Sequence, residues 1–393
     1  MNEFNVNALF DQQMKDELIA FTQELVRIKS YSGQEKDIIT FIAARMESLG
    51  YDEVVIDAMG NVVGRIGQGE KVIMFDSHVD TVEVKDEKEW TVPPFSGTIV
   101  NGRLYGRGSV DMKSSAAASI YGAVLAKKMG WTEGKTVYVS CTVLEEDCDG
   151  ENLKHLFSEL KIRPDWMVIC EPSDNIITLG HKGKAQIVIQ TQGVSAHGSA
   201  PEKGKNAVYE MAEIIQRVEA TNEALSKKPA PRGTLVLSQI SSLSASLNAV
   251  PFHCEIYLDR RMVVGETEDT VEAEMDKIID GKAASWQVGT LQRISWTGLP
   301  IVYEPLHAAW EISLDHPLTK ACQKAYEHTF GNAPTTYDYW DFSTNAVTSV
   351  SLDIPTIGFG PGEYKLAHMR DENCLVSQIT DACAFYATLV SQL

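Results

Sequence analysis

The sequence predicts an α/β fold: a mainly parallel sheet flanked by helices, into which an α+β domain of the ferredoxin-like type is inserted. Three observations support this prediction. Strand-like apolar runs alternate with helix-like segments before residue 183, and continuously apolar strands are typical of buried parallel sheets. Residues 183–296 instead follow the order β-α-β-β-α-β, which is typical of a small open-faced sandwich. Helix-like and strand-like segments return after residue 296.

The length of the chain agrees with two domains. Its 393 residues exceed what one ordinary hydrophobic core organises. We therefore predict that residues 1–182 and 297–393 form one domain, which carries the parallel sheet, and that residues 183–296 form the inserted domain.

The elements of the first domain follow from apolar spacing. Apolar residues recur at helical spacing over 8–30 and 35–49, and Gly50 is a natural stop for the second helix. Short β-rich runs follow in DEVVID, NVVGRI and KVIMFDS. The small-residue run SSAAASIYGAVLAKKMG predicts a helix packed closely on the sheet. Further strands are predicted in TVYVSCTVL, DWMVIC and NIITLG, with ENLKHLFSEL as a helix between the first two.

The inserted domain and the C-terminal part show the same kinds of pattern. Four strands are predicted in KAQIVIQTQG, RGTLVLSQI, FHCEIYLDRRMV and SWQVGTLQRISW. Helices are predicted at 205–226 and in ETEDTVEAEMDKIIDG. The chain then predicts a helix at 317–330, a short strand in IPTIGF and a last helix at 373–392.

Composition excludes several classes of function. The formal net charge of −19 argues against nucleic acid or an anionic membrane as a partner. The N-terminus lacks the basic and apolar regions of a secretory signal, and no apolar run approaches the roughly 20 residues that span a bilayer. The seven cysteines are scattered, with no C-x-x-C pair, so we expect reduced, buried thiols. These features predict a cytoplasmic protein.

Acidic and imidazole side chains follow the predicted strands of the first domain. They are His78 and Asp80 in FDSHVDTV, Asp111 in GRGSVDMKS, Glu145 and Glu146 in TVLEEDCDG, Glu171 in VICEPSD and His368 in KLAHMRDE. The carboxyl ends of parallel strands meet at one edge of a sheet, where sites form in open α/β folds. These nitrogen and oxygen ligands suit two divalent cations, with one carboxylate left to act as a base.

His78 and Asp80 stand two residues apart at the end of an extended run, so their side chains share a face. His78 can bind a metal while Asp80 accepts the N–H of the second ring nitrogen and fixes the tautomer. The competing interpretation is an exposed histidine beside a solvated aspartate, and for a single pair of this kind it is the more common one.

Asp111 follows Gly106 and Gly108 and precedes a helix, and its short carboxylate suits a bridge between two metals. A helix-capping aspartate is the competing interpretation. Glu171 ends a strand at the same predicted edge, and His368 lies in a loop rich in glycine and proline that could cover it. An ordinary loop histidine is the competing interpretation of His368.

Glu145 and Glu146 are adjacent at the end of a strand, where neighbouring side chains point to opposite sides. A division of labour fits this geometry, with Glu146 as a metal ligand and Glu145 as the general base. The competing interpretation is a solvated acidic loop, because further acidic residues follow directly.

The motifs HVDTV, GRGSVDMKS, LEED, CEPSD and AHMRDE, in this order, resemble those of the M20 metallopeptidases. The sequences of these motifs are most similar to those of a bacterial branch called selenium-metabolism-linked hydrolases. The resemblance implies a zinc-hydrolase sheet domain and two Zn²⁺ ions per subunit, although Co²⁺ or Mn²⁺ would suit the same ligands. It assigns His78 and Glu171 to one ion, Glu146 and His368 to the other, and Asp111 to both, with Asp80 as orienter and Glu145 as base.

The resemblance also implies roles for the inserted domain as a lid and dimerisation domain. His197 in GVSAHGSAP matches a histidine that reaches the active site of a partner subunit, which implies a homodimer. Asn248, Arg261 and Gly360 match substrate-contacting positions, with Gly362 in the same loop as Gly360. Two departures are Ser77, where many members have glycine, and the aromatic stretch YDYWDFSTNA in a region that helps to select substrate.

The expected function is hydrolysis of an amide bond in a small molecule: a dipeptide, an N-acyl amino acid or an N-carbamoyl amino acid. A metal-bound hydroxide formed with Glu145 would attack the carbonyl, and His197 would stabilise the oxyanion. Two alternatives remain open at this point. One is a metal-dependent phosphoester hydrolase, and the other is a metal-binding scaffold that has lost catalysis.

Overall fold

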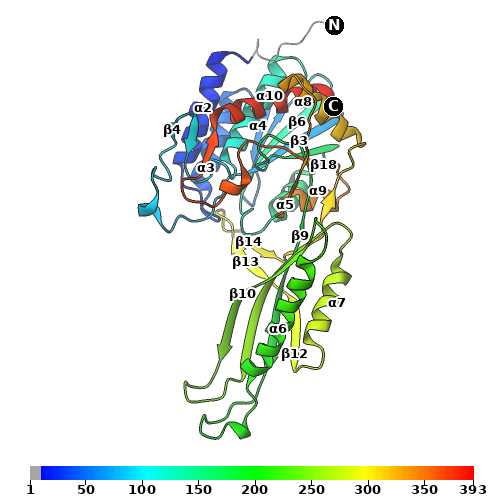
Figure 1. The fold of residues 1–393 in the computed structure, drawn as a ribbon. Coiled ribbons are helices and arrows are strands. Elements are labelled where there is room, and N and C mark those ends of the chain that lie inside the picture. The colour runs from blue at the N-terminus through cyan, green and yellow to red at the C-terminus, as the bar shows by residue number, and fades with distance from the viewer. Residues whose placement is uncertain (1–9) are drawn as a thin grey trace.

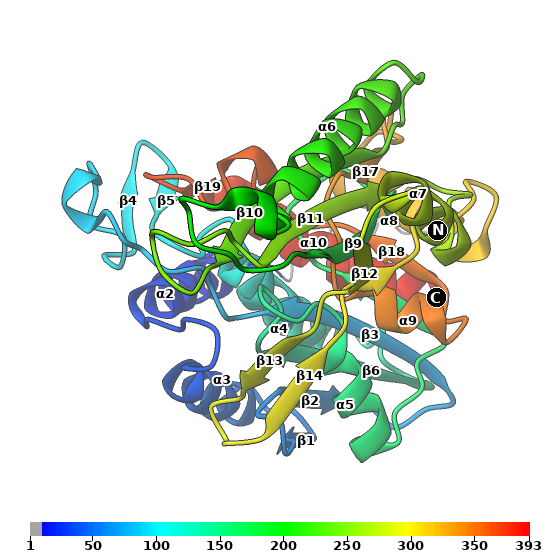
Figure 2. The same ribbon diagram turned by 90° about the horizontal axis from the view of Figure 1, so that it is seen from below.

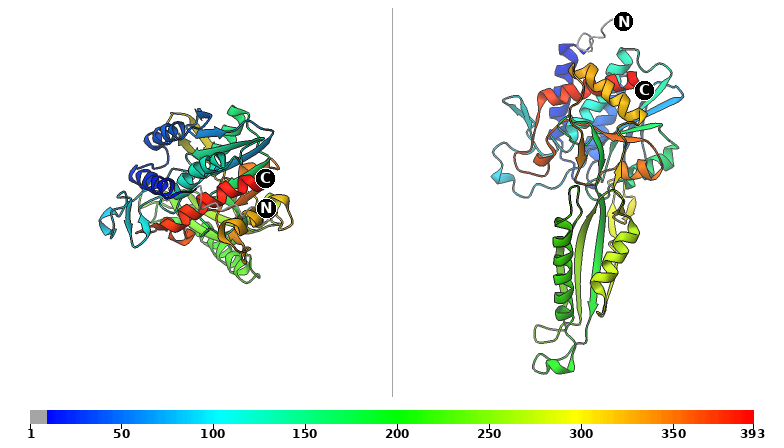
Figure 3. Two further views of the ribbon diagram at one scale, coloured as in Figure 1. Left: turned by 90° about the horizontal axis from the view of Figure 1, so that it is seen from above. Right: turned by 45° about the vertical axis from the view of Figure 1, so that its right-hand side comes forward.

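The computed structural model describes residues 10–393. Figure 1 shows two parts: a rounded part built on a sheet with helices, and an elongated part that projects from it. Figure 3 shows the same elongated projection from a second direction. Within the described residues, no helix combines the length and the apolar character needed to cross a membrane.

The rounded part is built on a nine-stranded mixed sheet. Its order is β1 (Glu53–Ile56), β2 (Val62–Ile66), β6 (Lys135–Thr142), β3 (Lys71–His78), β7 (Trp166–Ile169), β18 (Thr356–Gly358), β8 (Thr178–His181) and β16 (Trp310–Glu311), while β17 (Asp338–Trp340) also pairs with β8. The four strands from β6 to β18 are mutually parallel. Their carboxyl ends therefore meet at one edge, as the sequence predicts.

Helices cover both faces of this sheet. One face carries α2 (Gln12–Arg27), α3 (Lys36–Ser48), α4 (Lys113–Lys128), α8 (Pro317–Phe330) and α10 (Val376–Gln392), and the other carries α5 (Glu151–Leu160) and α9 (Ala346–Ser351). Successive strand residues face opposite cores: Phe75 packs with the first set and Met74 with the second. The small residues of α4 permit close packing, since a Cβ on Gly122 would lie 3.0 Å from the carbonyl oxygen of Cys383 in α10.

Beside the main sheet lies a small antiparallel sheet of β4 (Thr98–Val100), β5 (Arg103–Tyr105) and β19 (Asn373–Leu375). Its pairing of β5 with β19 brings two distant segments together, because Asn373 lies opposite Tyr105. The segment before α4 and the segment after His368 are thereby neighbours.

The elongated part has its own sheet and core. In chain order it contains β9 (Gly183–Gln192), α6 (Ala207–Ser226), β10 (Thr234–Leu243), β11 (His253–Met262), α7 (Glu268–Ile279) and β12 (Ala284–Val288). The strand order β10-β11-β9-β12 is antiparallel throughout. This is the ferredoxin-like arrangement, so the predicted fold class is confirmed.

One predicted strand is divided in the structure. SWQVGTLQRISW breaks at Gly289, and only β12 joins the inserted sheet. The second half forms β13 (Leu291–Ile294), which pairs with β14 (Pro300–Tyr303) against the rounded part (Figure 2). Trp296 in this hairpin donates a hydrogen bond to the carbonyl of Gly60 at 3.2 Å. The domain boundary at 183–296 stays a prediction.

Candidate active site

A cavity of about 300 Å³ opens at the carboxyl edge of the parallel strands, and residues at the root of the inserted part help to line it. It is lined by Asp111, Glu145, Glu146, Asp149, Glu171, Pro172, Lys184, Arg261, Phe342, Ser343, Tyr364, Ala367 and His368. Four of the five predicted metal ligands line it. The fifth, His78, is only 1% exposed and lies directly behind Asp111 at the end of β3.

Asp111 joins the two predicted ligand histidines. Its Oδ1 lies 2.8 Å from Nε2 of His78, and its Oδ2 lies 3.2 Å from Nε2 of His368. The Asp111 side chain does not cap α4, because the N-cap residue is Met112 and no side chain bonds the first turn. The competing capping role therefore falls away, and the two carboxylate oxygens face one imidazole each.

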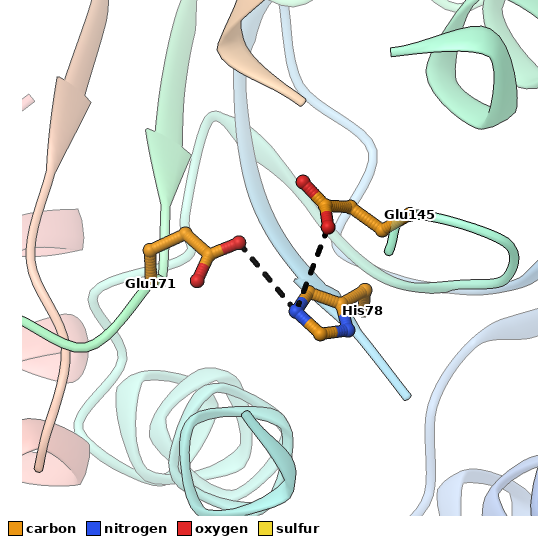
Figure 4. A group of neighbouring side chains, drawn as sticks. All are labelled: His78, Glu145 and Glu171. Atoms are coloured by element: carbon orange, nitrogen blue, oxygen red, sulfur yellow. Dashed lines mark ion pairs between the residues drawn. The ribbon is translucent and has the colours of Figure 1, made fainter. Parts of the chain in front are cut away.

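Glu171 and Glu145 approach His78 from two sides. Oε1 of Glu171 lies 3.6 Å from Nε2 of His78, and Oε2 of Glu145 lies 3.9 Å from the same nitrogen. Figure 4 shows both carboxylates pointing toward this ring. Each of these three side chains is buried, so their charges are poorly screened by water.

Glu146 belongs to the His368 side of the cluster, where its Oε2 lies 3.0 Å from Nε2 of His368. The expectation that Glu145 and Glu146 point to opposite sides of a strand is wrong. Strand β6 ends at Thr142, and Leu144 has a φ of 58°, so Glu145 and Glu146 lie in a turn and both face the cavity. They still divide their contacts, one toward each histidine.

Two buried carboxylates hold this turn. Asp80 accepts hydrogen bonds from the N–H groups of Glu145 at 3.0 Å and Glu146 at 3.2 Å, and Glu35 accepts from the N–H of Leu144 at 3.1 Å. The hydroxyl of Ser32 also donates to Asp80 at 2.8 Å. Backbone amides of a strained turn thus receive acceptors that fix the direction of both glutamates.

The predicted orienting role of Asp80 takes a different form. Nδ1 of His78 lies 3.0 Å from the backbone carbonyl oxygen of Asp80 but 3.6 Å from its carboxylate, which is too long for a hydrogen bond. The Asp80 carboxylate is already engaged by three other donors. The residue therefore orients the His78 ring through its main chain and the glutamate turn through its side chain.

Burial and charge shift the pKa values of the cluster. Burial raises the pKa of Glu145 and Glu171 well above the ordinary range, and raises that of Glu146 to about 7. Hydrogen bonds to Asp111 and Glu146 raise the pKa of His368 to about 10. The pKa of His78 is raised too, because the surrounding carboxylates outweigh the opposing effect of its burial. Such a cluster attracts positive charge, which protons or metal ions can supply.

The donor set fits metal ions. Ligand atoms of His78, Glu145 and Glu171 lie within 4.8 Å of one another, as do those of His78, Asp111 and Glu146. Imidazole and carboxylate groups are the ligands that Zn²⁺, Co²⁺ and Mn²⁺ share. The two groups share His78, so the cluster as a whole has the donor atoms that a divalent metal ion needs.

We expect the metal-free protein to lose stability as the pH rises from 6 to 8.5. Raised pKa values in Glu146, Glu35 (to about 8) and His368 mean that the folded state holds protons which the unfolded state releases. Their contribution is complete below the unfolded-state pKa values and is lost as the pH passes through the raised values. Groups whose pKa is lowered by burial, including Lys113 (to about 7) and His181 (to about 4), act in the opposite direction.

Thermal unfolding of chelator-treated protein at the two pH values tests this expectation. Added Zn²⁺ should raise the melting temperature more at pH 8.5 than at pH 6. At the higher pH fewer protons compete with the ion for the ligand atoms. A metal-free melting temperature that is constant or rises over this interval would contradict the expectation.

The root of the inserted part contributes two cations to the cavity. Lys184 on β9 and Arg261 on β11 are cross-strand partners. Nζ of Lys184 donates to Asp149 at 2.8 Å, and the Arg261 guanidinium makes two hydrogen bonds to Asp259, at 2.7 and 3.1 Å. The sequence analysis predicted that Arg261 contacts substrate but did not identify Lys184. Lys184 could have been found as a lysine at the start of the alternating strand β9, next to the first domain.

The cavity also has an apolar wall. Phe342, from the stretch YDYWDFSTNA, lies beside Tyr364 with ring centroids 6.0 Å apart, and Pro172 and Ala367 continue the wall. The sequence marked the stretch as unusual but did not identify Phe342 or Tyr364 as cavity residues. Their contact depends on a loop-to-loop approach that no local periodicity records.

The substrate contact of Gly360 stays a prediction, and its position shows a packing role. Gly360 does not line the cavity, and its carbonyl accepts from the N–H groups of Ser173 and Asn175. A Cβ at this residue would lie 2.4 Å from the carbonyl oxygen of Glu171. The glycine thus permits close packing behind Glu171, since any side chain there would displace the strand end that carries that carboxylate.

His197 and Asn248 lie away from this cavity. They share an exposed hollow beyond the far end of β9, where the N–H of Gly198 donates to the carbonyl of Asn248. The ten residues of β9 span roughly 30 Å at the rise of an extended strand. Neither side chain lies with the metal-ligand cluster of its own chain.

Comparison with known proteins agrees with this geometry. Residues 74–392 match the model of peptidase family M20/M25/M40. The chain belongs to this family. It is 36% identical over 377 residues to the uncharacterized protein YgeY of Escherichia coli (strain K12), covering 95% of this chain and 93% of that one. It is 29% identical to an acetylornithine deacetylase of Vibrio parahaemolyticus, covering 85% of each chain.

Among solved structures, the M20 family metallo-carboxypeptidase Sso-CP2 from Sulfolobus solfataricus matches with a TM-score of 0.74 and 18% identity, over 97% of this chain and 99% of that one. This match shows the fold. The chain is therefore a hydrolase of the M20 peptidase and deacylase family. The assignment to the selenium-metabolism-linked branch stays a prediction.

Proposed function

We propose that this M20 protein hydrolyses an amide bond in a small molecule that carries a carboxylate, using a pair of divalent metal ions. The single observation that carries the proposal is the arrangement around Asp111: each of its carboxylate oxygens faces a different imidazole, at 2.8 and 3.2 Å. A carboxylate so placed suits a bridge between two ions. His78 and Glu171 would hold one ion, and Glu146 and His368 the other.

Glu145 would serve as the general base. Its carboxylate faces the cavity beside the cluster, and burial raises its pKa, which favours acceptance of a proton from an attacking water. The same carboxyl group can then pass that proton to the nitrogen of the leaving amine. Bound ions, when present, lower the pKa of water and polarise a carbonyl oxygen.

Arg261 and Lys184 would receive the carboxylate of the substrate. Both cations line the same cavity as the acidic cluster, and an arginine fork matches a carboxylate with two hydrogen bonds. The cavity of about 300 Å³ suits an amino acid with a small N-linked group. The similarity to the acetylornithine deacetylase of Vibrio parahaemolyticus supports this class, since that enzyme is named for an acetylated substrate.

The tip of the inserted part would complete the site of a second subunit. His197 is exposed and lies on a projection that extends away from its own cavity. We propose that a homodimer brings this imidazole to the partner's scissile carbonyl, where it would stabilise the oxyanion. Asn248 shares the same hollow and would arrive with it.

Metal-dependent hydrolysis of a defined panel tests the proposed function. The panel contains dipeptides, N-acetyl, N-succinyl and N-carbamoyl amino acids, and a phosphoester control. We expect chelated protein to be inactive and to recover hydrolysis of at least one amide class with Zn²⁺, Co²⁺ or Mn²⁺. Cleavage of the phosphoester alone, or metal binding without hydrolysis of any panel member, would contradict the proposal.

A further inference from the structure

Glu372 is a buried carboxylate that the proposed mechanism does not use. It belongs to the AHMRDE motif but does not line the cavity, and it is 0% exposed. Its Oε1 accepts hydrogen bonds from the N–H groups of Val110 at 2.8 Å and Asp111 at 3.1 Å. The glutamate thus binds the backbone at the residue whose side chain lies between the two histidines.

Arg107 is the partner of Glu372. Nη1 of Arg107 lies 2.6 Å from Oε2 of Glu372, and the guanidinium is only 4% exposed. Its Nη2 donates to the backbone carbonyl of His368 at 3.2 Å. The indole of Trp90 covers the guanidinium at 5.3 Å from the ring centroid. One ion pair therefore connects the main chain of Asp111 with the main chain of His368.

Both supported residues lie outside regular structure. His368 has a φ of 61°, which is uncommon for a residue with a side chain, and Asp111 lies in the turn before α4. Neither backbone receives support from a helix or a strand at that point. Charge-assisted hydrogen bonds are roughly twice as strong as neutral ones, so the pair can hold both segments in place.

We propose that Arg107 and Glu372 are positioning residues that set the separation of Asp111 and His368, and so tune the affinity of the metal held by His368 and Glu146. The inference rests on the proposed dinuclear function but not on the identity of the amide. Arg107 and Glu372 contact the backbone of Asp111 and His368 but neither His78 nor Glu171. The ion predicted at His78 and Glu171 is therefore connected with this ion pair only through Asp111. The effect should therefore be unequal between the two ions.

The test is a titration of full-length, metal-free protein with Co²⁺, followed by calorimetry and by the visible absorption of the bound ion. Arg107→Lys keeps the charge but loses the planar fork, so it cannot make both contacts at once. We expect one of the two binding steps to lose about 10- to 100-fold in affinity and its absorption band to change, since altered support of ligands has effects of this size. The other step should change much less.

Arg103→Met is the matched control. Arg103 lies on neighbouring β5 and donates to Asn373 at 2.8 Å and to Glu363 at 3.3 Å, but it contacts neither ligand backbone. Its two binding steps should equal those of the wild type. Glu372→Gln is a second variant that keeps the shape and a carbonyl acceptor, and it should reproduce the selective loss seen for Arg107→Lys.

The outcomes separate the hypotheses. Two unchanged binding steps in both variants would overturn this inference alone. Equal loss of both steps, with an unchanged absorption spectrum of the remaining bound ion, would indicate a general structural role and would also overturn it. A wild-type protein that binds no Co²⁺ would overturn the proposed function and this inference together.

Discussion

Replacing Glu145 with glutamine should leave metal binding intact and reduce turnover by about 10²- to 10⁴-fold, the usual contribution of a general acid–base residue. Glutamine keeps the size of the side chain and its place in the turn, because Asp80 holds that turn through backbone amides. It cannot accept the proton of an attacking water. The loss should therefore fall on kcat, with KM little changed.

Two comparisons make this result specific. Glu145→Asp keeps a base but shortens its reach, so it should retain more activity than Glu145→Gln. The metal content of both variants, measured after dialysis, should match the wild type, because the proposed ligands are unchanged. A wild-type rate for Glu145→Gln would show that the base lies elsewhere, and loss of one metal equivalent would show that Glu145 is a ligand.

The sheet and the inserted domain could be predicted because their signals are local. The alternation of buried residues in β9 and β11 identifies half-buried antiparallel strands, and the small residues of α4 identify a helix packed closely on a sheet. The hairpin of β13 and β14 could not be separated from β12 in the same way. Its position depends on Trp296 packing near Gly60, a contact between residues far apart in the sequence.

The candidate ligands could be predicted because parallel strands bring their carboxyl ends to one edge. The geometry of the glutamate turn could not. The sequence pattern treats Glu145 and Glu146 as strand residues with opposite directions, whereas acceptors on Asp80 and Glu35 bend the chain so that both face the cavity. Glu35 lies more than a hundred residues upstream, so no local pattern connects it with this turn.

The same limit applies to the walls of the cavity. Lys184 and Arg261 meet because β9 and β11 pair in a particular register, and Phe342 meets Tyr364 because two loops approach. Side chains of this kind are placed by tertiary structure rather than by periodicity. The metal-ligand residues can therefore be predicted from the sequence more readily than the residues that select the substrate.

His197→Ala should reduce kcat by about 10²- to 10³-fold, the range observed when one oxyanion donor is removed. The imidazole lies beyond the far end of β9 and does not line its own cavity, so a direct effect on catalysis requires a second subunit. Metal content and the melting temperature should be unchanged, because the residue is exposed and remote from both cores. His253→Ala is a suitable control, since its ring lies near the same end of the sheet and makes a hydrogen bond with Gln192 at 3.2 Å.

Mixing inactive variants distinguishes a contribution from the partner subunit from a contribution within the chain. Random exchange between Glu145→Gln and His197→Ala subunits makes half of the dimers mixed, and one of their two sites then has an intact Glu145 and the partner's intact His197. Activity should recover to about a quarter of the wild-type value, as two-fold symmetry requires. If His197 acted within its own chain, both sites of a mixed dimer would lack a catalytic group and no activity would return. A monomeric protein with full activity would contradict the shared site directly.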